Sequence, residues 1–173
     1  MRLYKCSFSV FYRRATYALA PRHSQVVGDG HGRSSAVQRG MEEYVDLLCR
    51  EIAAVPAGDV APAPLRTVFF GGGTPSLLPH PLLLRVLAAL RDKFSLAPDA
   101  EISMEMDPGT FDAARLREVR EAGVSRVSVG VQAFDDALLK SCGRAHSLAD
   151  TREALALLAA ERAEAEVREH LVF

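Results

Sequence analysis

The stretch Thr67-Val68-Phe69-Phe70-Gly71-Gly72-Gly73-Thr74-Pro75 decides the fold, because it joins a short apolar strand to a run of three glycines. A strand that is apolar on both faces is typical of a parallel sheet covered by helices. Glycines leave backbone N–H and C=O groups unshielded, so a ligand can approach the main chain closely. The alternative is a simple strand-to-helix turn. The run matches neither the Walker loop nor Gly-x-Gly-x-x-Gly, so a phosphate site is poorly supported.

A strand–helix rhythm surrounds this stretch. Periodicity, Pro and Gly positions predict further strands at 101–106 and 126–131, with 3–12 as a candidate strand near the N-terminus. Helices are expected from Met41 to Val55, from Pro79 or Pro81 to about Phe94, over 112–122 with Gly123 as the C-terminal cap, over 135–140, and from Leu148 to about Arg168. Residues 56–64 are a linker rich in Ala, Pro and Gly. The pattern predicts an α/β fold with a parallel sheet and helical crossovers.

Polar residues follow the ends of three predicted strands. The ends, Phe70, Met106 and Val131, lie 36 and 25 residues apart, as successive βα units do. Right-handed crossovers place all three C-terminal ends at one edge of the sheet, where ligands bind in open sheets and barrels. We therefore expect the glycines and Thr74, then Glu105 and Asp107, then Gln132 to share that edge.

Each candidate residue has an ordinary structural alternative. Glu105 shares a strand face with Ser103 and Glu101, and a buried acid is costly unless it is paired or binds a polar ligand. Gln132 offers a donor and an acceptor. Asp107, before Pro108, is interpreted as a turn residue.

The segment after the third predicted strand holds two further candidates. Arg144 could bind a carboxylate in a forked geometry, although such arginines are mostly surface residues. His146 is interpreted as a solvated loop histidine. Cys49 is interpreted as a small core residue of a helix and Cys142 as a loop residue. These spacings indicate no catalytic triad.

Composition restricts the class of protein. The 173 residues are 49% hydrophobic and 25% charged, the mix of a globular protein, and no apolar run approaches the length of a membrane span. The three cysteines are odd in number and widely spaced, which fits neither a disulfide framework nor a zinc site.

Charge is uneven along the chain. Residues 1–40 carry a net charge of +6 and the remainder −7. We expect residues 1–40 to be a poorly ordered basic leader, either an organellar transit peptide, mitochondrial or plastid, or an aberrant N-terminus of a cytoplasmic protein. A nucleic-acid arm is not expected, because no aromatic and basic patch continues into the body.

Three blocks, 67–78, 101–109 and 126–134, closely resemble the radical S-adenosylmethionine proteins of the oxygen-independent coproporphyrinogen III oxidase group. Cys142-Gly-Arg-Ala-His-Ser147 resembles the haem-chaperone branch of that group. The resemblance runs from about Glu42 to Ala160 and implies that residues 41–173 are part of a (β/α)₆ partial barrel. It also implies that S-adenosylmethionine is bound by Gly72, Gly73, Thr74, Glu105, Gln132 and Arg144.

The sequence departs from the family pattern in its cysteines. The family carries Cys-x-x-x-Cys-x-x-Cys after its first strand to hold a [4Fe–4S] cluster, whereas only Cys6 precedes Met41 here. We therefore expect no cluster, no metal ligand and no catalytic residue, and interpret the chain as incomplete at both ends and inactive alone. The resemblance links it to porphyrin or haem metabolism or haem delivery. The alternatives are a non-catalytic protein that binds haem or S-adenosylmethionine, or a fragment without function.

Overall fold

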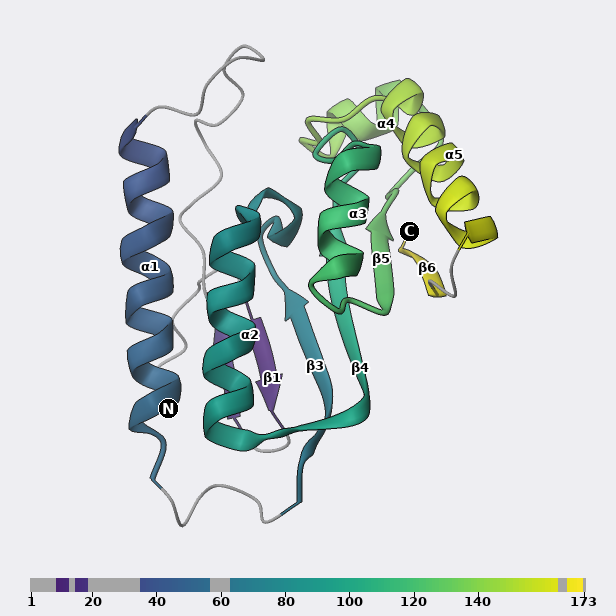
Figure 1. The fold of residues 1–173 in the computed structure, drawn as a ribbon. Coiled ribbons are helices and arrows are strands. Elements are labelled where there is room, and N and C mark those ends of the chain that lie inside the picture. The colour runs from purple at the N-terminus through teal and green to yellow at the C-terminus, as the bar shows by residue number, and fades with distance from the viewer. Residues whose placement is uncertain (1–8, 13–14, 19–34, 57–62, 165–167, 173) are drawn as a thin grey trace. The chain divides into compact units, whose positions relative to one another are not determined.

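In the computed structural model, residues 9–12, 15–18, 35–56, 63–164 and 168–172 are described. The chain divides into two compact units, one of residues 1–23, 67–77 and 101–173 and the other of residues 24–66 and 78–100. Figure 1 labels most of the elements of both units. The first unit contains most of the sheet, and the second contains a pair of helices together with the strand residues 65–66 and 96–100.

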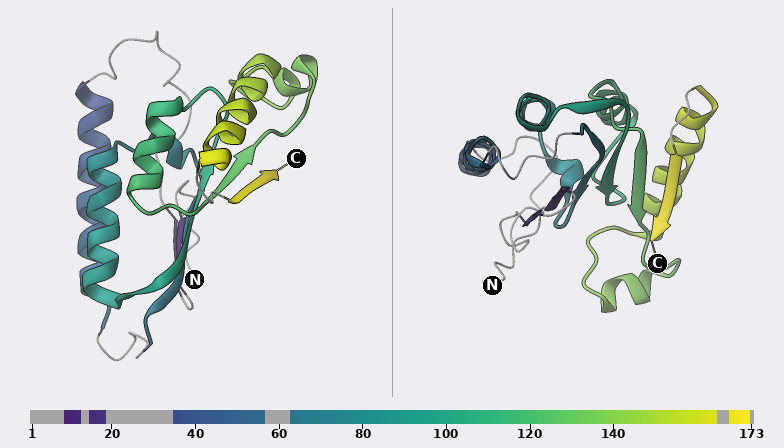
Figure 2. Two further views of the ribbon diagram at one scale, coloured as in Figure 1. Left: turned by 45° about the vertical axis from the view of Figure 1, so that its right-hand side comes forward. Right: turned by 90° about the horizontal axis from the view of Figure 1, so that it is seen from below.

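Among the described residues, six strands form the sheet in the order β2-β1-β3-β4-β5-β6. They are β1 (Ser9–Tyr12), β2 (Ala15–Ala18), β3 (Leu65–Gly71), β4 (Leu96–Met106), β5 (Arg126–Gly130) and β6 (Arg168–Val172). β4, β5 and β6 pair in parallel, and Figure 2 shows β5 and β6 side by side and pointing the same way. The expected parallel sheet is therefore present over β4, β5 and β6.

The sheet differs from the sequence prediction at three points, the first being β4, which begins at Leu96 and not at Glu101. β1 pairs with β2 and with β3 in antiparallel fashion, and Ser9–Tyr12 of the candidate strand 3–12 is a strand, whereas residues 3–8 lie outside the described residues. The helix predicted to reach Arg168 is wrong at its end, because α5 (Leu148–Glu164) stops earlier and Arg168–Val172 is β6. Backbone pairing with β5 there overrides a local composition that favours a helix.

The parallel strands have one apolar and one polar face. Ile102, Met104 and Met106 alternate with Ser103 and Glu105, as the strand period of two requires. In β5, Val127 and Val129 continue the apolar face, because they pair in register with Met104 and Met106. All five apolar side chains are buried.

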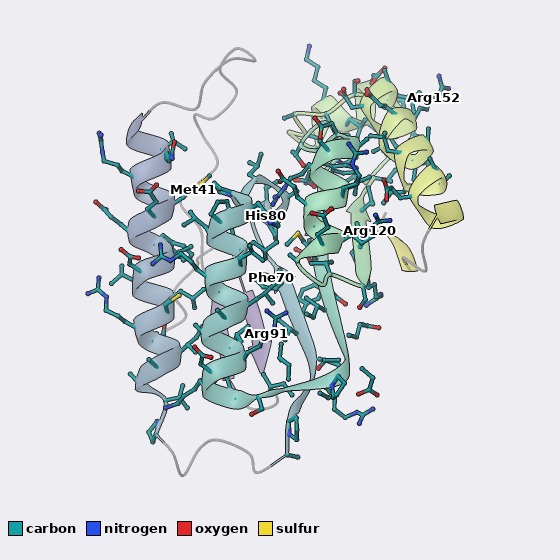
Figure 3. All side chains as sticks on the ribbon, in the orientation of Figure 1. Met41, Phe70, His80, Arg91, Arg120 and Arg152 are labelled. Atoms are coloured by element: carbon teal, nitrogen blue, oxygen red, sulfur yellow. The ribbon has the colours of Figure 1, made fainter. Side chains whose placement is uncertain are left out.

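Helices α3 (Ala113–Glu121) and α5 pack on the apolar face. Leu116 and Val119 of α3 and Leu158 of α5 line one small cavity together with Val127 of β5. An ion pair at 3.2 Å between Arg120 of α3, which is labelled in Figure 3, and the largely buried Glu161 of α5 also joins the two helices.

Capping residues fix where the helices of this unit begin. Asp112 accepts a hydrogen bond from Arg115 N at 2.7 Å and caps α3, and Asp135 caps α4 (Asp136–Ser141) in the same way. Ser147 and Asp150 form a reciprocal capping box at the start of α5. Two hydrogen bonds from Ser147 lower the pKa of Asp150, and the bond from the Ser147 side chain has a larger effect than the bond from its backbone. The nearby His146 lowers this pKa further.

The helices of the second unit are α1 (Ser35–Ala54) and α2 (His80–Phe94). Asp46 pairs with Arg85, and Lys93 Nζ donates to the Ala53 carbonyl at 2.9 Å. α1 begins six residues before the predicted start at Met41, so it crosses the boundary expected between leader and body at residue 40. The rest of the leader, apart from β1 and β2, lies outside the described residues, as does most of the predicted linker.

Cys49 of α1 is partly buried, and its thiol donates a long hydrogen bond to the Arg85 carbonyl at 3.9 Å. Burial raises the pKa of this thiol, opposed by the positive charge of Arg85 and reinforced by the negative charge of Asp46. The thiol is therefore mostly protonated at neutral pH.

Candidate functional site

The glycine run at the end of β3 is hydrogen-bonded to the neighbouring strand β4. Gly72 and Gly73 have φ angles of +80° and +64°, in the region that glycine adopts without steric cost. The backbone N–H of Gly72 donates to Glu105 Oε2 at 2.6 Å. The other carboxylate oxygen of Glu105 makes no hydrogen bond to any described residue. One half of this carboxylate therefore holds the turn, and the other half can meet a ligand.

Asp107, directly after β4, connects three segments of the site. Its Oδ2 accepts from Thr74 Oγ1 at 3.3 Å and its Oδ1 accepts from Arg144 Nη2 at 2.5 Å. Its carbonyl also accepts from Thr110 Oγ1 at 2.6 Å, so it is a turn residue as well. The sequence interpretation of Asp107 as a turn residue was thus incomplete, because the side chain bonds to residues 33 and 37 positions away.

Gln132 follows β5 with a φ of +63°, an uncommon value for a residue other than glycine. Gly130, two residues earlier, leaves room for its neighbours. A Cβ at Gly130 would lie 2.8 Å from Asp107 Oδ1 and 3.3 Å from both Arg144 Nη2 and Gln132 Nε2. The absent side chain is therefore what lets these three groups converge. A glycine inside a strand signals such a close approach, but the sequence analysis did not single it out.

Arg144 is placed by the end of α4. Gly143, with a φ of +69°, donates to the Lys140 carbonyl, and Arg144 N donates to the Leu139 carbonyl at 2.9 Å. These two bonds form a Schellman motif, which ends the helix and turns the chain back toward the sheet. Arg144 Nε is buried and has no hydrogen-bond partner in the described part of the chain.

His146 differs from its prediction as a solvated residue. It is only 8% exposed, and its Nε2 lies 3.2 Å from the Val131 carbonyl oxygen. Nothing in the local sequence signals this contact, since the partner is fifteen residues away.

Cys142, predicted in a loop, is the exposed cap residue at the end of α4.

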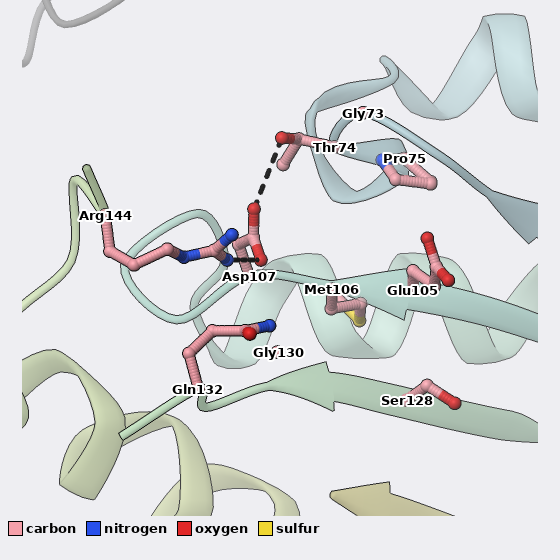
Figure 4. Close-up of a pocket in the computed structure, with 10 residues that line it drawn as sticks. All are labelled: Gly73, Thr74, Pro75, Glu105, Met106, Asp107, Ser128, Gly130, Gln132 and Arg144. Atoms are coloured by element: carbon pink, nitrogen blue, oxygen red, sulfur yellow. Dashed lines mark hydrogen bonds and ion pairs between the residues drawn. The ribbon is translucent and has the colours of Figure 1, made fainter. Parts of the chain in front are cut away.

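These side chains surround a cavity of about 150 Å³, shown in Figure 4. Glu105 lies on one side and Arg144 with Asp107 on the other, while Gln132 reaches in from the end of β5. The lining residues are Gly73, Thr74, Pro75, Glu105, Met106, Asp107, Ser128, Gly130, Gln132 and Arg144. Five of the six residues expected at the site thus line one cavity. The sixth, Gly72, instead holds Glu105 in place.

The cavity residues fit a zwitterion. The unpartnered Glu105 oxygen suits an ammonium group, and Arg144 Nε suits a carboxylate. The methionine end of S-adenosylmethionine carries both groups. Because drug-sized ligands occupy about 300–1,000 Å³, a cavity of 150 Å³ holds only part of such a molecule.

The residues present do not fit a [4Fe–4S] cluster. The sequence has three cysteines separated by 43 and 93 residues, and Cys49 and Cys142 belong to different units. Over the described ranges, no three His, Cys, Asp or Glu side chains gather as a metal site requires.

None of the described helices has the length and apolar character needed to cross a membrane.

Comparison with known proteins gives one consistent result. Residues 5–165 match the radical SAM superfamily. The chain is 51% identical over 122 residues to the heme chaperone HemW of Synechocystis, an overlap that covers 70% of this chain and 29% of that protein. It is 36% identical over 115 residues to the oxygen-independent coproporphyrinogen III oxidase of Paracoccus denitrificans. This overlap covers 66% of this chain and 26% of that protein.

A solved structure gives the same result at the level of the fold. Coproporphyrinogen III oxidase (HemN) from Escherichia coli, described as a radical SAM enzyme, is similar with a TM-score of 0.68 and 30% identity, over 78% of this chain and 30% of that one. The predicted fold class and family resemblance are therefore confirmed. The chain spans about 30% of the length of the relatives it matches.

Proposed function

Because the chain belongs to the radical SAM superfamily, we propose that the cavity at the strand edge binds the methionine end of S-adenosylmethionine. One observation carries the proposal: Glu105, Gln132 and Arg144, expected at one edge from the sequence, line one cavity with Gly73 and Thr74. Glu105 Oε1 would accept from the ammonium group, and Arg144 would bind the carboxylate through Nε. The Gln132 amide would contact the same end of the ligand.

Glu105 gives the sharpest test, because its two oxygens have different roles. Glu105→Ala removes both the ligand contact and the acceptor for Gly72 N–H. Glu105→Gln keeps an oxygen for Gly72 N–H but loses the negative charge that faces the ammonium group. If the site is assigned correctly, both variants lose affinity, since a hydrogen bond to a charged group contributes about 1.5–3 kcal/mol, or roughly tenfold to a hundredfold.

Calorimetry with S-adenosylmethionine measures these affinities. Glu121→Ala is the matched control, because it removes an exposed carboxylate at the end of α3 outside the cavity. The proposal fails if Glu105→Gln binds as tightly as the unaltered chain, or if the unaltered chain binds no more than the Glu105→Ala variant.

The second part of the proposal concerns the substrate class. We propose a role in haem or porphyrin metabolism, of the haem-chaperone type rather than the oxidase type. The identity of 51% to a heme chaperone over 122 residues supports it, as does the sequence Cys142-Gly-Arg-Ala-His146. Titration with haem, followed by its Soret absorbance, tests this part separately. A chain that binds S-adenosylmethionine and leaves the haem spectrum unchanged would contradict the haem role alone.

The cluster is the point at which this chain departs from a radical enzyme. Since the cysteine set does not fit a [4Fe–4S] cluster, we propose that the chain alone is a binding protein without radical activity.

A further inference from the structure

The turn at Gln132 is strained. The backbone N–H of Ala133 donates to the Val131 carbonyl at 2.7 Å, which closes a turn over one residue with φ at +63°. A γ-turn of this positive-φ type is rare, and it costs more for a residue that has a side chain. Such a conformation persists only where the surrounding structure supports it.

His146 supplies a contact that supports this turn. Its Nε2 lies 3.2 Å from the Val131 carbonyl oxygen, the same oxygen that accepts from Ala133. A carbonyl oxygen only accepts hydrogen bonds, so Nε2 carries the proton and donates. The oxygen has two lone pairs and can accept both bonds. Since His146 is 8% exposed, water competes little for this contact.

From these contacts we infer that His146 is a positioning residue that holds the strained turn and thereby aims the Gln132 amide into the cavity. His146 itself does not line the cavity, whereas Gln132 does. In Figure 4 the Gln132 side chain extends toward Gly130 and Arg144. The effect on ligand binding rests on the proposed function, but the effect on the turn does not.

The experiment compares two amide replacements. The amide nitrogen of Gln can take the place of His Nε2, whereas that of Asn, one carbon shorter, corresponds to Nδ1. His146→Gln should therefore keep the bond to the Val131 carbonyl, and His146→Asn should lose it. Both replacements are polar and smaller than or similar in size to His, so neither overpacks the site.

Amide hydrogen exchange reports on the turn without any ligand. Ala133 N–H is bonded within the turn, so His146→Asn should speed its exchange by about threefold to tenfold, the equivalent of one ordinary hydrogen bond. His146→Gln should restore it. Thr151→Val is the control, because Thr151 is fully buried and, within the described part of the chain, its hydroxyl donates to the Ser147 carbonyl alone, at 3.1 Å. Removing the Thr151 hydroxyl should leave the hydrogen exchange rate of the Ala133 amide unchanged.

Binding of S-adenosylmethionine tests the link to Gln132. His146→Asn should weaken affinity by about threefold to tenfold in the unaltered chain. In the Gln132→Gly background it should have almost no further effect, because glycine adopts this turn without strain and has no amide to aim.

Two results would overturn the inference. One is unchanged Ala133 exchange in His146→Asn, and the other is an equal loss of affinity with and without the Gln132 side chain. If the unaltered chain binds no S-adenosylmethionine, the proposed function fails and hydrogen exchange alone decides the role of His146.

Discussion

Gly130→Ala should close the space in which three polar groups of the cavity meet. Gly130 lies outside the left-handed region, so its backbone accepts alanine and the cost is steric. The new Cβ would lie 2.8 Å from Asp107 Oδ1, closer than such atoms approach, and 3.3 Å from Arg144 Nη2 and Gln132 Nε2. Asp107 cannot move freely, because Thr74 and Arg144 both bond to its carboxylate.

The expected loss of stability follows from the Arg144–Asp107 hydrogen bond, which this displacement disturbs most. A hydrogen bond between charged groups contributes about 1.5–3 kcal/mol when well shielded. Arg144 and Asp107 have side chains 27% and 25% exposed, so solvent screening lowers the figure to about 1–2 kcal/mol. For a chain of this size each kcal/mol lowers the melting temperature by roughly 2–4 °C. We therefore expect a decrease of about 2–8 °C.

Thermal unfolding measured by circular dichroism tests this, with Gly40→Ala as the matched control. Gly40 lies in α1 and a Cβ there meets nothing within 4 Å, so alanine should stabilise the helix by about 0.5–1 kcal/mol. In the Asp107→Ala background, Gly130→Ala should cost much less, since the carboxylate that it crowds is gone. A Gly130→Ala variant as stable as the unaltered chain, or an equal cost in both backgrounds, would refute the reasoning.

Three further outcomes are expected. Iodoacetamide should modify the exposed Cys142 faster than Cys49, because burial raises the pKa of the Cys49 thiol; equal rates in peptide mass mapping would contradict this. Since the pKa of Asp150 is lower in the folded chain, the stability it contributes is present above about pH 4 and decreases as the pH falls through the lowered pKa. Asp150→Asn should therefore reduce the difference in melting temperature between pH 7 and pH 3, whereas Glu153→Gln should not. Anaerobic reconstitution with iron and sulfide should leave no [4Fe–4S] cluster, and about four irons per chain, lost on replacing Cys6, would contradict this.

The sequence was sufficient to predict that Glu105 and Gln132 meet at the strand edge. Strand period and parallel pairing place Glu105 and Gln132 at the ends of neighbouring strands, and the structure brings both to one cavity. That argument needs only local patterns and the rule for crossovers. Their role in binding S-adenosylmethionine stays a prediction.

The contacts that organise the site could not be predicted in this way. Asp107 bonds to Thr74 and Arg144, and His146 bonds to Val131, across 33, 37 and 15 residues. Such pairs form only once the strands and the end of α4 are in place. β6 was missed for the same reason, because a segment preceded by an Ala- and Glu-rich helix becomes a strand by pairing with β5.

The side chain at position 144 has two roles, and arginine has the separate donors that both roles require. Nη2 is bonded to Asp107, which keeps the guanidinium beside the ends of β4 and β5. Nε is buried and has no partner among the described residues, so it remains for a second acceptor. Arginine presents several donors in a rigid plane, whereas lysine offers a single ammonium that would have to serve both acceptors. A ligand carboxylate bound at Nε would therefore leave the bond between Arg144 Nη2 and Asp107 intact.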